Sequence, residues 1–409
     1  MQCGKFLVIA MGAGLLAAAS AGAASGQDEP SSTVKEYRQH MFDEPVRSLA
    51  NRTMELMFNV ARVEQGARAA ALPEAITSLD FSYDFGGKTH PALDVLEDTH
   101  TDAMLILKNG RVVFERYLNR SDARTHFNSY SMAKSINSIL VGLAVADGRI
   151  HSIDDPVLKY VPELKGSGYD GTTIENLLEM RSGVEWDDNF FAADTASHKA
   201  HVASWVEERM RYADAAAGTR RAHQPGSVYN YNTMDAGVIG LVVERAVGEP
   251  ISRYLSRRLW QPGGMQSYGF YVIDGAPGVG REFSGGGFNA VLRDYGRLGL
   301  LMQDQGRLNG RQILSPDYVI QSTKAGTVKD ADTEVKGLGY AYFWWPVLGS
   351  RAYTALGGEG QFIYVDPATK TVIVKMSHGP VGPAAAAQEQ EALSFFAAAS
   401  KWPGARPPH

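Results

Sequence analysis

Residues 131–146 of this 409-residue chain read SMAKSINSILVGLAVA. Its apolar residues recur at helical spacing before Asp147-Gly148 ends the pattern, so we expect a buried helix. Ser131 opens this helix, and Lys134 follows three positions later. On a helix the two side chains share one face, with Cβ atoms about 5 to 6 Å apart.

The pairing of Ser131 with Lys134 predicts nucleophilic chemistry. Serine is a poor nucleophile until a base removes its proton, and lysine becomes that base only where burial or a neighbouring cation lowers its pKa. A serine at a helix start also lies near free backbone N–H groups that can stabilise an oxyanion. The alternative is structural, with an N-capping serine and a solvated lysine.

A second S-x-x-K pattern, Ser32 to Lys35, shows that the spacing alone is not specific. It lies in a polar segment where we expect disorder, whereas Ser131 opens an apolar helix. The context therefore favours Ser131 as the nucleophile and Lys134 as its general base.

Two features further along the chain carry related chemistry. A turn that begins at Pro225-Gly226 delivers Tyr231 immediately before an apolar helix, and a phenol there can relay a proton to a leaving group. The alternative is a core aromatic. Gly357-Gly358 precedes the strand pattern 362–365, and glycines at a strand edge let a substrate backbone approach closely. The alternative is a glycine-rich turn.

The elements around these features predict the fold class. Asn109-Gly110 joins two apolar runs as a hairpin, and residues 353–377 return to strands with a turn at Asp366-Pro367. An alanine-rich helix follows over about 384–399, and residues 153–280 read as helical and loop-rich. We therefore expect an α/β fold of the α+β type, in which an antiparallel sheet is flanked by helices and carries an inserted, mostly helical subdomain.

The N-terminal residues predict that the protein is exported. Residues 1–24 combine Lys5, an apolar run and a small-residue series, which is typical of a secretory signal peptide, and we expect cleavage after Ala23 or Ala24. The only cysteine, Cys3, lies ahead of the apolar run, so the mature protein would have no thiol or disulfide. We expect a partly helical N-terminal extension over 25–97, with helix around 54–63, a main domain over 98–402 and a tail over 403–409.

In this order, the three features resemble the serine β-lactamase and penicillin-binding-protein superfamily, on its class C side. The connecting stretches 153–162, 173–183 and 285–290 also resemble members of this superfamily. Within it, residues 231–233, 343–345 and 360–367 look most like the 6-aminohexanoate-dimer hydrolases. The resemblance covers roughly residues 103–399 and implies the β-lactamase/transpeptidase-like fold.

The resemblance implies roles for particular residues. Ser131 would be the acylated nucleophile, Lys134 its general base and Tyr231 the proton relay. Backbone N–H groups of Ser131 and Gly358 would form the oxyanion hole. Substrate-binding positions would be Gly357, Asn232, Trp186 and Phe190.

Two departures from the superfamily pattern shift the expected substrate. The usual Tyr-x-Asn is Tyr231-Asn232-Thr233, and the usual Lys-Thr-Gly is Ala355-Leu356-Gly357, so the cation that would hold a β-lactam or peptide carboxylate is missing. Phe190 matches a tyrosine that helps to orient the amide in the 6-aminohexanoate-dimer hydrolases. Small esters are therefore expected to be cleaved better than amides.

Other function classes find little support. The ten histidines show no paired metal-ligand spacing, no G-x-S-x-G is present, and the G-x-G-x-x-G at 166–171 follows no strand, so we expect no metal and no cofactor. With a net charge of −5 and scattered basic residues, nucleic acid is not an expected partner, and no membrane span is expected after signal removal. The oligomeric state stays open. The alternatives are a β-lactamase or D,D-peptidase-type enzyme and a non-catalytic cell-envelope binding protein.

Overall fold

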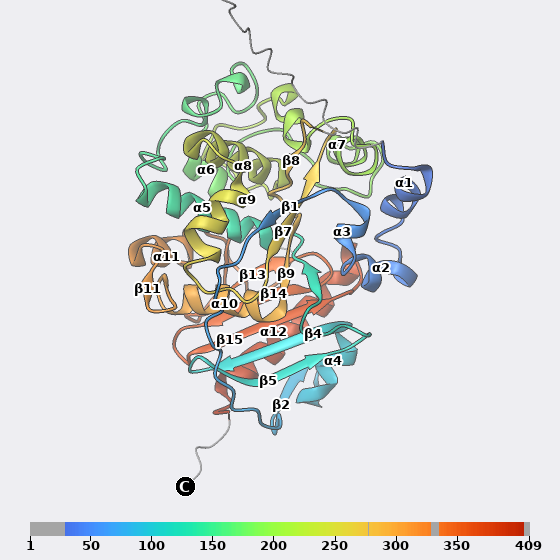
Figure 1. Ribbon diagram of the computed structural model, residues 1–409, viewed down its shortest axis with the longest axis vertical. Coiled ribbons are helices and arrows are strands. Elements are labelled where there is room, and N and C mark those ends of the chain that lie inside the picture. The colour runs from blue at the N-terminus through green and yellow to red at the C-terminus, as the bar shows by residue number, and fades with distance from the viewer. Residues whose placement is uncertain (1–28, 277, 329–334, 405–409) are drawn as a thin grey trace, which may run out of the picture.

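The computed structural model describes residues 29–276, 278–328 and 335–404, and its largest sheet joins distant parts of the chain (Figure 1). The early hairpin of β4 and β5 turns at Asn109-Gly110, whose φ angles of 51° and 72° suit a type I′ turn as predicted. Strand β15 (Thr371–Ser377) pairs antiparallel with β4 (Thr101–Lys108), which confirms the predicted antiparallel sheet. The antiparallel order is β12 (Trp345–Pro346), β13 (Tyr353–Gly357), β14 (Gln361–Asp366), β15 (Thr371–Ser377), β4 (Thr101–Lys108), β5 (Arg111–Tyr117).

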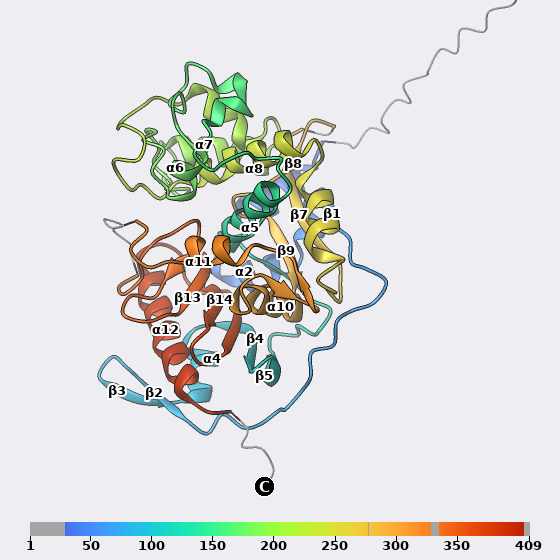
Figure 2. The same ribbon diagram turned by 90° about the vertical axis from the view of Figure 1, so that its left-hand side faces the viewer.

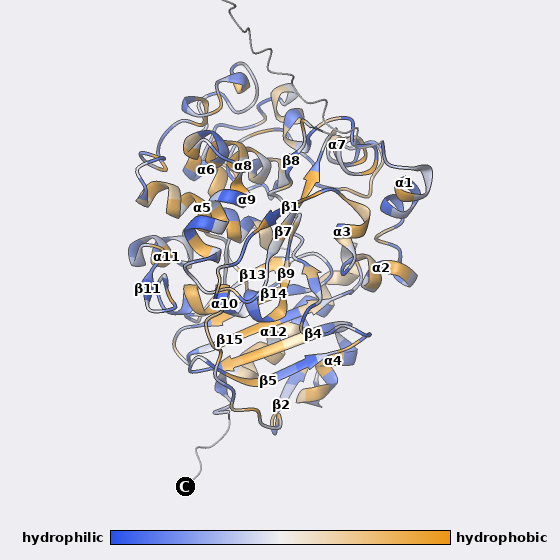
Figure 3. Cartoon of the chain, viewed as in Figure 1, coloured by the Kyte–Doolittle hydropathy of each residue, from blue (hydrophilic) through white to orange (hydrophobic). Residues whose placement is uncertain are grey.

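Both faces of this sheet are covered, and residues 103–107 of β4 are all hydrophobic, as expected for a strand that is buried on both faces (Figure 3). Leu105 faces one core, where it packs close to Gly296 of helix α10 (Leu292–Gln303). Ile106 faces the other core, together with aromatic residues of helix α12 (Ala385–Lys401). The predicted helix over about 384–399 is therefore confirmed.

Helix α5 (Met132–Ala146) is the predicted buried helix, and every residue from Met132 to Ala144 is buried. It lies between the main sheet and the helical part of the chain (Figure 2). The helical part contains these elements: η2 (Val157–Lys159), η3 (Pro162–Leu164), α6 (Ile174–Leu178), α7 (Ala196–His201), η4 (Val202–Val206), η5 (Tyr212–Gly218), α8 (Thr233–Val247), α9 (Ile251–Leu255), η6 (Ser256–Trp260).

A second antiparallel sheet corrects two predictions. Residues 60–63 form strand β1 rather than helix, and residues 269–274 form strand β7 inside the range expected to be helical. β-Branched and aromatic residues such as Val60 and Tyr271 favour strands, and pairing between the two segments supplies the partner that local pattern could not reveal. The order is β1 (Val60–Val63), β7 (Gly269–Asp274), β9 (Phe288–Val291), β6 (His126–Asn128), with β8 (Arg281–Glu282) beside β7.

The N-terminal segment is helical where disorder was expected. Ser31 accepts a hydrogen bond from the Val34 N–H and caps α1 (Ser32–Gln39), so the second S-x-x-K lies on a helix, with an exposed Ser32. Helices α2 (Glu44–Ala50) and α3 (Met54–Met57) follow. The buried Arg38 guanidinium pairs with Glu208 at 2.7 Å, which ties α1 to the residues after η4.

Smaller elements complete the described chain: β2 (Ser82–Phe85), β3 (Lys88–Pro91), η1 (Ala92–Asp94), α4 (Val95–Asp98), β10 (Arg307–Leu308), β11 (Arg311–Gln312), α11 (Pro316–Ser322), η7 (Gly382–Ala384). The expected signal peptide at 1–24 lies outside the described residues. Among the helices of the described ranges, none has the length and apolar character that a membrane crossing requires.

Candidate active site

Ser131 lies at the N-terminus of α5, directly after a strained residue. Tyr130 has a φ of 43°, in the left-handed region, and its ring is buried. The Ser131 side chain makes no capping hydrogen bond to the helix backbone. Its Oγ instead accepts a hydrogen bond of 2.9 Å from Lys134 Nζ. The structural alternative for this serine, a simple N-cap, therefore does not describe its side chain.

Lys134 is buried rather than solvated, with 2% of its surface exposed. Besides the bond to Ser131, its Nζ donates to the carbonyl of Gly285 at 2.8 Å. Burial lowers the pKa of Lys134 to about 8, although the nearby Asp188 carboxylate acts in the opposite direction. The pKa of the amine is thus shifted toward neutral pH, which a lysine needs in order to act as a base.

Asp188 is a half-buried carboxylate that the sequence did not single out. Its carboxylate accepts from the Thr233 N–H at 2.9 Å, from Thr233 Oγ1 at 2.7 Å and from the indole N–H of Trp186 at 3.2 Å. Burial raises the pKa of Asp188, while Lys134 and these hydrogen bonds lower it. Only the fold distinguishes it from the exposed Asp187 beside it.

Tyr231 is brought to the same place by the turn before α8. The Lys134 Nζ lies 5.1 Å from the centroid of its ring, and the ring packs against Trp345 at 5.6 Å. The neighbouring Asn232 caps α8, because its Oδ1 accepts from the N–H groups of Met234 and Asp235 at 2.8 and 3.3 Å. Its predicted contact with substrate stays a prediction.

The Gly357-Gly358 edge passes directly beside the serine. A Cβ on Gly357 would lie 2.2 Å from the backbone carbonyl oxygen of Ser129 and 3.2 Å from Ser131 N, so only glycine allows β13 to approach α5 this closely. Gly358 and Ser131 line one pocket. The structure thus brings together all three predicted features.

Glu359 links the N-terminal segment to this edge, and no sequence pattern pointed to it. The carboxylate is 1% exposed and accepts hydrogen bonds from Tyr130 Oη at 3.1 Å and from the Asn51 side-chain amide. Arg47 Nε lies 3.8 Å away, and burial raises the pKa of Glu359 to about 8. Because Asn51 and Glu359 lie 308 residues apart in sequence, no local spacing could reveal their contact.

The pocket at Ser131 has a volume of about 270 Å³. Phe190 lines it as predicted for a substrate-binding position, whereas Trp186 does not. The residues that line the pocket are Phe42, Tyr130, Ser131, Phe190, Phe191, His201, Trp205, Thr233, Phe283, Gly285, Gly286, Gly358, Glu359, Val381, Gly382, Ala385 and Glu389.

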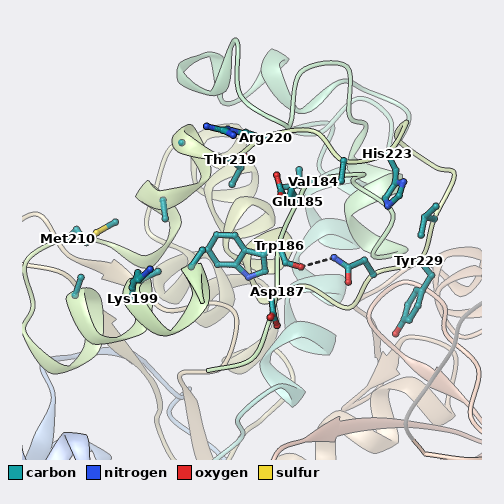
Figure 4. A pocket seen from close by; sticks show the side chains of 18 of the residues that line it. Val184, Glu185, Trp186, Asp187, Lys199, Met210, Thr219, Arg220, His223 and Tyr229 are labelled. Carbon is teal, nitrogen blue, oxygen red and sulfur yellow. Dashed lines mark hydrogen bonds between the residues drawn. The ribbon is translucent and has the colours of Figure 1, made fainter. Parts of the chain in front are cut away.

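Trp186 instead lines a larger cavity of about 1070 Å³ in the helical part of the chain (Figure 4). Its backbone carbonyl accepts from Asn230 Nδ2 at 3.0 Å there. The two spaces share no lining residue. Trp186 therefore does not line the Ser131 pocket, and its indole N–H instead donates a hydrogen bond to Asp188.

One cluster in the described ranges could hold a metal ion, but it lies elsewhere. Ligand atoms of His90, Asp98 and Glu391 lie within 4.8 Å of one another, on the hairpin β2–β3 and helices α4 and α12. None of the three lines the Ser131 pocket.

The sequence of this chain matches a family model and known proteins. The family model described as Beta-lactamase matches residues 93–396. A 6-aminohexanoate-dimer hydrolase from Paenarthrobacter ureafaciens is 30% identical over 299 residues, which cover 70% of this chain and 74% of that protein.

Solved structures agree on the fold. A Bacillus anthracis structure, provisionally assigned as a 6-aminohexanoate-dimer hydrolase, is 24% identical with a TM-score of 0.79 and covers 92% of this chain and all 100% of its own. A class C beta-lactamase is 16% identical with a TM-score of 0.53 and covers 77% of this chain and 95% of its own. The predicted fold class and superfamily are confirmed.

Proposed function

Because the chain belongs to the Beta-lactamase family and is a serine hydrolase, we propose that it cleaves small ester or amide bonds through an acyl-enzyme on Ser131. The observation that carries this proposal is the 2.9 Å hydrogen bond between Lys134 Nζ and Ser131 Oγ, made by a lysine that is 2% exposed. A buried amine with a lowered pKa is the activated base that a serine nucleophile needs.

The first half of the reaction forms the acyl-enzyme. Lys134 takes the proton of Ser131 Oγ, which attacks the substrate carbonyl carbon and forms a C–O bond. The backbone N–H groups of Ser131 and Gly358 stabilise the oxyanion. Tyr231, beside the lysine ammonium, relays the proton to the departing alcohol or amine as its bond to the carbonyl carbon breaks.

The second half regenerates the enzyme. A water molecule gives up a proton to the same base and attacks the acyl carbon. As the bond to Ser131 Oγ breaks, the base returns this proton to Ser131 Oγ. The products are a carboxylic acid and free Ser131, so the cycle consumes one water per substrate and needs no cofactor.

Esters are the preferred substrates in this proposal. Phe190 supplies no hydroxyl to orient an amide, and Ala355 stands where a lysine would bind a carboxylate. The 30% identical relative is named for hydrolysis of 6-aminohexanoate dimer, so this dimer is the amide to test first. The β-lactamase alternative keeps the support of the family match and of the class C fold.

A substrate panel tests the proposed function. Wild type and Ser131→Ala are compared on 4-nitrophenyl acetate, 6-aminohexanoate dimer and a chromogenic cephalosporin. We expect the ester to be turned over fastest and the Ser131→Ala variant to be inactive. Faster turnover of the cephalosporin would support the β-lactamase alternative. Cephalosporin binding that survives in Ser131→Ala, with no turnover by wild type, would support a binding protein.

We also propose that the protein is exported after cleavage of its signal peptide behind Ala23 or Ala24. The support is the sequence pattern of Lys5, the apolar run and Ala21 to Ala24. Expression in a bacterial host followed by N-terminal sequencing of the periplasmic protein tests this. A start at Ala24 or Ser25 is expected, and an intact N-terminus retained in the cytoplasm would contradict it.

A further inference from the structure

The pocket beside Ser131 is walled by aromatic rings, and its lining among the described residues includes no Lys or Arg. We propose that it selects esters bearing an uncharged aromatic group, on either side of the scissile bond. This inference rests on the proposed function and names the substrate class of the same site.

Aromatic rings that contact one another form the wall. Phe42 meets Phe191 edge-on at 5.6 Å between ring centroids, and Trp205 meets Phe283 edge-on at 4.8 Å. Such edge-to-face pairs are the arrangement that aromatic rings prefer, and they leave further ring faces and edges for a bound ring. Phe190 completes the wall.

His201 joins the two pairs without adding charge. Its ring lies 6.0 Å from Phe42 and 5.4 Å from Trp205. Burial lowers the pKa of His201 to about 4, so the imidazole is neutral at pH 7. It therefore adds an aromatic surface and no cation to the pocket.

The rings are fixed from behind by other parts of the core. Phe190 stacks on Tyr212 at 6.1 Å, Phe283 meets the same tyrosine edge-on at 5.2 Å, and Trp205 packs on Phe58 at 5.0 Å. The phenylalanine and tryptophan rings of the wall come from four chain segments: the connection after α1, the residues before α7, η4 and the chain after β8. His201, the last residue of α7, adds a fifth. Because these rings are already packed, binding a substrate ring costs little ordering entropy.

The N-terminal segment takes part through Phe42. This residue lies between α1 and α2, and α2 is tied to the serine loop by the network of Asn51, Glu359 and Tyr130. The N-terminal segment thus contributes one ring, that of Phe42, to the pocket.

The volume of the pocket and the charges of its lining residues limit the kind of substrate that it can bind. The pocket volume of about 270 Å³ exceeds the roughly 150 Å³ of a cavity that binds benzene. Its lining includes no Lys or Arg from the described chain, while Glu359 and Glu389 both face it. A substrate carboxylate would lose its water without gaining a partner, which is costly, so anionic substrates are disfavoured.

Four alkyl esters of similar intrinsic reactivity test the inference in a pH-stat. Ethyl acetate carries no ring, benzyl acetate carries it on the alcohol, ethyl phenylacetate on the acyl group, and monoethyl succinate carries a carboxylate. We expect kcat/KM for at least one aromatic ester to exceed that for ethyl acetate by about tenfold or more, with monoethyl succinate slowest. The aromatic ester with the higher kcat/KM shows whether the pocket binds the alcohol side or the acyl side of the scissile bond.

Variants locate the effect. In Phe42→Ala and Phe190→Ala the ratio of kcat/KM for the better aromatic ester to that for ethyl acetate should fall about fivefold or more. Phe85→Ala, at a comparably half-buried ring on the distant strand β2, should leave the ratio unchanged. Phe42→Leu removes the ring but keeps more of the packing volume, and it serves if Phe42→Ala does not fold.

The outcomes separate this inference from the function beneath it. Equal kcat/KM values for all four esters, fastest turnover of monoethyl succinate, or an unchanged ratio in both phenylalanine variants would overturn the aromatic pocket while leaving a working esterase. Absence of all ester turnover, with wild type and Ser131→Ala indistinguishable, would overturn the proposed function itself.

Discussion

Burial controls the protonation of Lys134. The side chain is 2% exposed and its pKa is lowered to about 8. The sequence could predict this because an S-x-x-K pattern at the head of an apolar helix forces the lysine into the core. The Ser32–Lys35 copy has the same spacing on an exposed helix, so burial and not spacing separates the two.

The pH profile of the wild type follows from this pKa. Only the neutral amine can accept the proton of Ser131, so kcat/KM should rise with pH and level off above about 8. Lys134→Arg keeps a cation that stays protonated and should reduce kcat/KM by at least about a hundredfold. A profile that is flat from about pH 6 to 9 would contradict this role.

Asp188 should tune the same titration. Its negative charge favours the protonated lysine, so Asp188→Asn should move the rising limb of the kcat/KM profile to lower pH. Asparagine keeps an oxygen that can accept from Thr233, which limits structural damage. Asp187→Asn is the matched control, because Asp187 is the exposed neighbour. Identical profiles for the two variants would show that Asp188 does not act on Lys134.

At the scale of elements, the contact between β13 and α5 depends on one missing side chain. Gly357→Ala would place a Cβ 2.2 Å from the Ser129 carbonyl oxygen, which is backbone and cannot move aside alone. We expect a loss of about 1 to 3 kcal/mol in unfolding free energy, measured by urea denaturation, together with a strong loss of esterase activity.

Gly218→Ala is the control for this substitution. A Cβ at Gly218 meets no atom within 4 Å, and its φ is not in the left-handed region, so stability should change by less than about 0.5 kcal/mol. Equal stability of the Gly357 and Gly218 variants would mean that the close approach of β13 is not required.

Local pattern predicted some elements and missed others for physical reasons. The Asn109-Gly110 hairpin, α5 and α12 carry their signals within a few residues, and all three are confirmed. Strand β1 is short, and its stability comes from pairing with β7, which lies far along the chain. In so short a segment, a hydrophobic period of 3.6 residues (helix) cannot be told from a period of 2 residues (strand). The prediction of a helix over 54–63 was therefore wrong beyond Met57.

At the scale of the whole molecule, the site joins three regions. Ser131 directly precedes α5 and Lys134 lies within it, Tyr231 comes from the helical part, and Gly358 lies between β13 and β14 of the main sheet. These residues could be predicted because each carries a local motif. Asp188 and Glu359 could not, because their importance comes from partners that only the folded chain brings near.

The hydrogen bonds that join the N-terminal segment to the site should contribute measurably to the unfolding free energy. Asn51→Ala removes a hydrogen bond to Glu359 and one accepted from Tyr130 Oη, which leaves buried polar groups short of partners. We expect a loss of about 1 to 3 kcal/mol in unfolding free energy, with a lower kcat/KM. Thr53→Ala, which removes only an exposed hydrogen bond to Leu49, should cost less than about 0.5 kcal/mol. Equal losses in the two variants would argue against such a contribution.

The central claim, that Ser131 is the nucleophile and Lys134 its base, is tested most directly by a fluorophosphonate probe read by intact mass and peptide mapping. Wild type and Ser32→Ala should each take up one label on Ser131, while Ser131→Ala should take up none and Lys134→Arg should react much more slowly. A label on another serine, or labelling that persists in Ser131→Ala, would contradict the claim.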